Sequence, residues 1–63
     1  MKLKAVVVDD EDLARKNLTM LLHEYCEGVE VAGEAGNVSA AKALIEQEKP
    51  DVVFLDIRMP SGS

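Results

Sequence analysis

Three aspartates stand where apolar strands would end, and their carboxylates could together bind a divalent cation. Asp9 and Asp10 directly follow the apolar run 5–8, and Asp56 directly follows the apolar run 52–55. Ligand sites of parallel sheets lie at the carboxyl ends of the strands, so we expect the three acids to meet if the two strands are neighbours. Carboxylates packed closely repel one another unless a proton or a cation lies between them. Because Mg²⁺ takes one or two protein carboxylates and keeps several waters, the pattern predicts a magnesium site.

Helix capping is the alternative explanation for acids at these positions. An Asp just after a strand is common because an acid is stabilised by the positive N-terminus of the helix that follows. Glu11 and Asp12 fit that explanation. Capping would account for one such acid, but three acids at one edge of a sheet favour a binding site. We therefore assign Asp10 and Asp56 to the site first, and Asp9 after them.

The elements that must position these acids follow from the apolar pattern. The unbroken runs 5–8 and 52–55 predict strands that are covered on both faces, and the partly alternating stretch 29–34 predicts a strand nearer an edge. Between these strands, apolar residues recur at intervals of three and four, which predicts a helix in each of the two gaps. The order strand–helix–strand–helix–strand predicts an α/β unit with a parallel sheet and right-handed crossovers.

The first helix is expected over residues 12–26, with Asp12 as its N-cap and Gly28 in the left-handed conformation after its end. Its predicted buried stripe consists of Ala14, Leu18, Leu21, Leu22 and Tyr25, widened by Leu13 and Met20. The second helix is expected to begin at the N-cap Asn37 and to end before Pro50, which disfavours helical geometry at Lys49. Its predicted buried residues are Val38, Ala41, Leu44 and Ile45.

Composition limits the class of protein. Sixty-three residues make at most one small domain, which buries only about 60% of its unfolded surface. Seven basic against twelve acidic residues give a net charge of −5, which argues against direct binding of nucleic acid or anionic lipid. No apolar run approaches the roughly 20 residues of a membrane span. Cys26 is the single cysteine, so it cannot form an internal disulfide, and an unpaired thiol fits a reducing compartment. We therefore predict a soluble cytoplasmic protein in which Cys26 is a small apolar filler.

Two stretches resemble the receiver domain of two-component response regulators: residues 7–11 (VVDDE) and residues 49–60 (KPDVVFLDIRMP). Together, at this separation, they are strongly specific. Residues 8–15 also look like regulators that carry a LytTR-type DNA-binding output domain. The resemblance implies the first half of a flavodoxin-like, doubly wound sheet with strand order 2-1-3. Residues 1–63 are accordingly expected to be a truncated receiver domain.

The resemblance also implies a role for each site residue. Asp56 resembles the phosphoacceptor, which takes a phosphoryl group from a sensor histidine kinase as an aspartyl phosphate. Asp10 resembles the direct Mg²⁺ ligand, and Asp9 its neighbour acting largely through water. The main-chain carbonyl of Arg58 looks like a further protein ligand. The implied module is a phosphoprotein of signal transduction and not an enzyme.

Part of the family pattern is not found in residues 1–63. The second half of the family's fold supplies strands four and five, a Ser or Thr that contacts the phosphoryl group, and a Lys that pairs with it. Lys49 lies at the end of the strand opposite the acids and is not a substitute. We therefore expect metal binding to survive and phosphorylation to be impaired. The strand at 52–55 would form an open edge, so a homodimer or swapped assembly through that strand is expected.

Two other functions remain open at this point. The chain could be an inert half-domain that only self-associates. It could also be a phosphatase of the haloacid-dehalogenase type, which uses a strand-end Asp and Mg²⁺. That class needs a second acid two positions after the nucleophile, where this sequence has Arg58.

Overall fold

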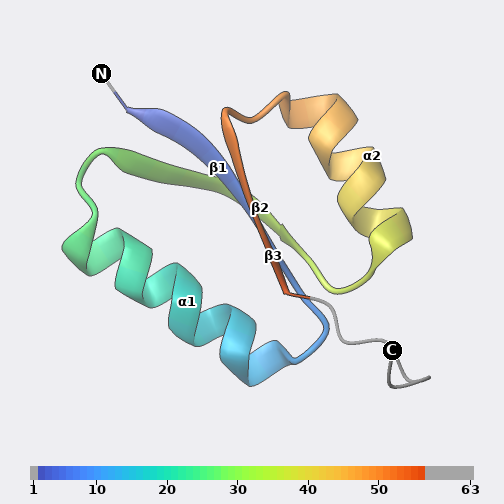
Figure 1. The fold of residues 1–63 in the computed structure, drawn as a ribbon, viewed down its shortest axis with the longest axis horizontal. Coiled ribbons are helices and arrows are strands. Elements are labelled where there is room, and N and C mark those ends of the chain that lie inside the picture. The colour runs from blue at the N-terminus through green and yellow to red at the C-terminus, as the bar shows by residue number, and fades with distance from the viewer. Residues whose placement is uncertain (1, 57–63) are drawn as a thin grey trace.

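A parallel three-stranded sheet with one helix on each face forms the fold of the computed structural model (Figure 1). The structure describes residues 2–56. In chain order the elements are β1 (Leu3–Asp9), α1 (Asp12–Tyr25), β2 (Val29–Ala35), α2 (Val38–Glu48) and β3 (Val52–Asp56). The strand order is β2-β1-β3, as the resemblance implied. The predicted α/β class, element order and parallel sheet are therefore confirmed.

The core is centred on β1. The side chains of Ala5, Val6, Val7 and Val8 are fully buried, because β1 lies between the other two strands and has a helix on each face. Both helices pack against β1 and β2, and neither packs closely against β3. The prediction that the run 5–8 is covered on both faces is confirmed.

The matching prediction for the run 52–55 is wrong. β3 is one of the two edge strands of the described sheet, and Val53 and Leu55 are 39% and 67% exposed. Among residues 2–56 no further strand pairs with β3, which agrees with the open edge expected from the resemblance. An unbroken apolar run indicates a strand made for burial on both faces, but it does not indicate whether other elements cover it.

Helix α1 departs from its prediction at both ends. Its N-cap is Glu11, with no side-chain cap hydrogen bond, and Asp12 is the first helical residue. The helix ends at Tyr25, where the Cys26 N–H donates to the Leu22 carbonyl. Gly28 is not left-handed; its carbonyl instead accepts from the Leu3 N–H at 2.7 Å, which starts the pairing of β1 with the segment before β2. Cys26 is exposed, so it is not an apolar filler.

The buried stripe of α1 is narrower than predicted. Leu22 is buried, and Ala14 and Leu18 are partly buried. The remaining members of the predicted stripe are exposed, namely Leu13, Met20, Leu21 and Tyr25. Because α1 covers β1 and β2 but not β3, part of its apolar surface has no strand beneath it.

Helix α2 confirms both of its predicted ends. The Asn37 side chain accepts a hydrogen bond from the Ala40 N–H at 2.8 Å, as an N-cap does. The helix ends before Pro50 with Lys49 in the left-handed conformation (φ 49°, ψ 60°). Of its predicted buried residues, Ala41 is buried and Leu44 packs on the core. Val38 and Ile45 were also predicted to be buried, but they are exposed, because α2 packs on β1 and β2 and not on β3.

Candidate functional site

The register of the sheet brings Asp9 and Asp56 side by side. β1 pairs in parallel with β3 so that Asp9 lies opposite Asp56 at the carboxyl ends of the two strands. Neighbouring strands lie about 4.8 Å apart, so the two backbones are in direct contact range. Asp10 follows Asp9 in the turn that leads to α1. The expectation that positions 9, 10 and 56 share one edge of the sheet agrees with this register.

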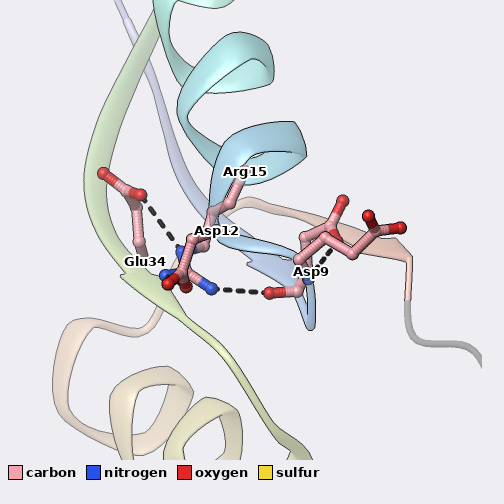
Figure 2. Close-up of polar contacts among 5 residues, drawn as sticks. Asp9, Asp12, Arg15 and Glu34 are labelled. Atoms are coloured by element: carbon pink, nitrogen blue, oxygen red, sulfur yellow. Dashed lines mark hydrogen bonds and ion pairs between the residues drawn. The ribbon is translucent and has the colours of Figure 1, made fainter.

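The Asp9 side chain is buried and has a defined hydrogen-bond partner. It is 5% exposed, and its Oδ1 accepts a hydrogen bond from the Glu11 N–H at 2.9 Å (Figure 2). Its main-chain carbonyl accepts a second hydrogen bond from the Arg15 guanidinium at 2.7 Å. Asp9 is therefore fixed by contacts at its carboxylate and at its carbonyl.

Asp10 and Asp56 have the opposite character. Both residues are exposed at the rim of the sheet, next to the buried Asp9. A carboxylate that attacks an incoming group, or that shares a hydrated cation, must be reachable from solvent. Their exposure meets that requirement, and the burial of Asp9 suits a supporting position.

The donor chemistry at this edge fits Mg²⁺. Within residues 2–56, no three His, Cys, Asp or Glu side chains are grouped closely enough to enclose a metal ion. Mg²⁺ does not need such a cage, because it is usually held by one or two carboxylates and several waters. Asp9, Asp10 and Asp56 offer oxygen donors of that kind. The predicted carbonyl ligand at Arg58 lies outside the described residues, so the ligand set stays a prediction.

Sequence reasoning missed Arg15. Its guanidinium donates to the Asp9 carbonyl and pairs with the carboxylates of Asp12 and Glu34, the latter with 3.4 Å between Nε and Oε1 (Figure 2). The spacing of Asp12 and Arg15, three residues apart on one helix, could have indicated their ion pair. Nothing in the sequence places Glu34 or the Asp9 carbonyl within reach of Arg15, because both contacts depend on the tertiary packing of β2 and β1.

Comparison with known proteins identifies the family. The family model described as "Response regulator receiver domain" matches residues 5–63. The chain belongs to the response regulator receiver domain family. It is 52% identical over 56 residues to an uncharacterized response regulatory protein of Vibrio cholerae, covering 89% of this chain and 22% of that relative. No solved structure is a significant match.

Other relatives of this receiver chain have names that state a function. It is 45% identical over 58 residues to the transcriptional regulatory protein BtsR of Salmonella typhi and 43% identical to BtsR of Escherichia coli. Each match covers 92% of this chain and 24% of the relative. The chain thus spans about a quarter of the length of these relatives. Membership of the family supports a phosphoacceptor role in two-component signalling, and receiver domains are generally not enzymes.

No helix within residues 2–56 has the length and apolar character that crossing a membrane requires.

Proposed function

We propose that this chain is a phosphoacceptor module in which Asp56 receives a phosphoryl group from a sensor histidine kinase. The observation that carries the proposal is the register pair of Asp9 and Asp56 inside the stretch that matches the receiver family. Asp10 and Asp56 would hold Mg²⁺ directly, Asp9 would act largely through water, and the Arg58 carbonyl would complete the protein ligands. Bound Mg²⁺ would offset the charge on the phosphoryl oxygens.

In the proposed reaction, Asp56 is the nucleophile in a displacement at phosphorus. One Asp56 carboxylate oxygen attacks the phosphorus of the kinase phosphohistidine and forms a P–O bond. The P–N bond breaks as this bond forms, and its electron pair returns to the imidazole nitrogen. The exposed position of Asp56 at the end of β3 leaves its carboxylate reachable by a second protein. The net charge of −5 supports a protein partner rather than direct contact with nucleic acid.

Asp56 is tested by a phosphodonor experiment on the 63-residue chain. Incubation with acetyl phosphate and Mg²⁺, followed by intact mass measurement, is expected to give an adduct of one phosphoryl group. The yield is expected to be low, because residues 1–63 lack the family's Ser or Thr and Lys. The adduct should be abolished in Asp56→Asn and kept in Glu24→Gln, a control that removes one exposed acid from α1.

Other outcomes of that experiment favour the competing functions. An adduct that persists in Asp56→Asn contradicts the assignment of the phosphoacceptor. Magnesium binding without any adduct would indicate an inert half-domain. Steady turnover of small phosphomonoesters would indicate a phosphatase. The sensor kinase partner, the cytoplasmic location typical of response regulators and the LytTR-type output domain are likewise proposals.

We also propose that the 63-residue chain forms a homodimer through β3. A groove of about 460 Å³ lies beside this strand, and its apolar lining includes Val38 and Ile45 of α2 and Val53 and Leu55 of β3. Lys42 and Glu46 also line the groove, one turn apart on α2. A two-fold axis could place each Lys42 near Glu46 of the partner subunit, so the charges and the apolar surface are both self-complementary.

A further inference from the structure

The Arg15 side chain connects three segments that meet at the acidic edge of the sheet, the edge that carries Asp9, Asp10 and Asp56. Its contacts come from the end of β1 (Asp9 carbonyl), the first turn of α1 (Asp12 carboxylate) and the end of β2 (Glu34 carboxylate). The Arg15 side chain is 17% exposed, so most of it lies within the protein. We propose that Arg15 is a positioning residue that holds the turn bearing Asp9 and Asp10 in the geometry that binds the divalent cation. This inference rests on the proposed metal-dependent function.

The hydrogen bonds explain how Arg15 could act on the metal ligands without touching the metal. The Asp9 carboxylate is held by the Glu11 N–H, and the Asp9 carbonyl is held by Arg15. Asp10 lies between these fixed points, in a turn of two residues before α1. Loss of the Arg15 contact would leave the Asp9 carbonyl without this donor and release one side of the turn.

The charges around Arg15 are balanced in a way that suits a cation site. A positive side chain close to metal ligands would normally weaken cation binding through repulsion. Here the guanidinium is paired with two carboxylates, those of Asp12 and Glu34. Its positive charge is therefore offset locally, while its planar donors remain available to fix three partners at once.

Gly36 is an independent sign that the Arg15 guanidinium requires space beside the Asp9 carbonyl. A β-carbon at position 36 would lie 3.1 Å from Arg15 Nη1 and 4.0 Å from the Asp9 carbonyl oxygen. The first distance is closer than ordinary van der Waals contact, so a side chain here would push the guanidinium away from the Asp9 carbonyl. Gly36→Ala therefore perturbs the same hydrogen bond while leaving Arg15 in place.

The test is a Mg²⁺ titration of the 63-residue chain, followed by the NMR shifts of the Asp10 and Glu11 amides. Residues that orient metal ligands typically change metal affinity 10–100-fold when they are replaced. Arg15→Gln is expected to weaken Mg²⁺ binding about tenfold at a temperature where circular dichroism shows it folded. Arg15→Lys should recover part of the affinity, because an ammonium can donate to the Asp9 carbonyl but cannot hold all three partners. Lys16→Gln removes the same charge from the exposed neighbouring position and should bind as the wild type does.

Gly36→Ala keeps the inference testable if Arg15→Gln does not fold. This variant is expected to weaken Mg²⁺ binding in the same direction, by a smaller factor, and to move the Arg15 side-chain NMR signals. A folded Arg15→Gln or Gly36→Ala variant with wild-type Mg²⁺ affinity overturns the positioning role. A wild-type chain that binds no Mg²⁺ overturns the proposed metal-dependent function itself, which is a different result.

Discussion

The three aspartates at positions 9, 10 and 56 differ in burial, and that difference suits the separate roles proposed for them. The Asp9 carboxylate is buried and accepts from the Glu11 N–H, whereas Asp10 and Asp56 are exposed. A buried carboxylate with a fixed donor keeps one orientation and can support its neighbours. The exposed carboxylates are accessible to the cation and to the phosphoryl group of the proposed function. The sequence grouped all three acids, but the separation of roles depends on the turn that follows β1.

Substitutions at Asp9 should separate its hydrogen bond from its charge. Asp9→Asn keeps an oxygen that can accept from the Glu11 N–H, so its melting temperature should stay near that of the wild type while Mg²⁺ affinity falls. Asp9→Ala removes the acceptor as well and should lower the free energy of unfolding by about 1–2 kcal/mol. Thermal melts and Mg²⁺ titrations of both variants provide the measurement. Equal destabilisation by Asn and Ala would contradict the hydrogen-bonding role of the Asp9 side chain.

At the scale of single elements, the ends of α2 are determined locally. Asn37 provides the acceptor for the Ala40 N–H, and Lys49 takes the left-handed conformation in front of Pro50. A non-glycine residue in that conformation costs about 1–2 kcal/mol, so the packing of α2 must offset this cost. Gly33 helps α2 to pack, because a β-carbon there would lie only 2.9 Å from Leu44 Cδ1.

Removing the N-cap should destabilise the chain measurably. Asn37→Ala loses the hydrogen bond to the Ala40 N–H and is expected to lower the free energy of unfolding by about 1 kcal/mol. Ser39→Ala is the matched control, because Ser39 is exposed in the first turn of the same helix and has no capping role there. Urea unfolding followed by circular dichroism measures both. A control as unstable as Asn37→Ala would mean that the cap is not the cause.

The elements also show which features a sequence can predict. The run 5–8 was predicted to be a buried strand and is one, because its burial comes from strands and helices within the described chain. The stripe of α1 and the apolar face of α2 were predicted to be buried, yet Tyr25 and Val38 are exposed. Periodicity indicates which side of a helix is apolar, but not whether another element lies against it. The Arg15 contacts escaped prediction for a related reason, since they join segments that are distant in sequence.

At the scale of the whole molecule, the core of the described chain is small and does not extend over β3. The buried apolar residues within the described chain centre on β1 and on the surfaces of α1 and α2 that face β1 and β2. Within residues 2–56 the surface beside β3 is apolar and uncovered, and no strand pairs with the outer side of β3. Such an edge is a template for pairing with another chain. Association through it would enlarge the core that a domain of this size can form alone.

The dimer predicted from this surface can be tested by sedimentation equilibrium. The wild-type 63-residue chain is expected to sediment as a dimer at micromolar concentration. Leu55→Lys places a charge on the exposed edge strand and should shift the chain to monomer, because charged side chains disfavour edge pairing. Leu13→Lys is the matched control: Leu13 is 73% exposed on α1, away from the groove, and this variant should remain dimeric. A wild-type chain that sediments as a cooperatively folded monomer contradicts the dimer, and dissociation by Leu13→Lys but not by Leu55→Lys would place the interface on α1.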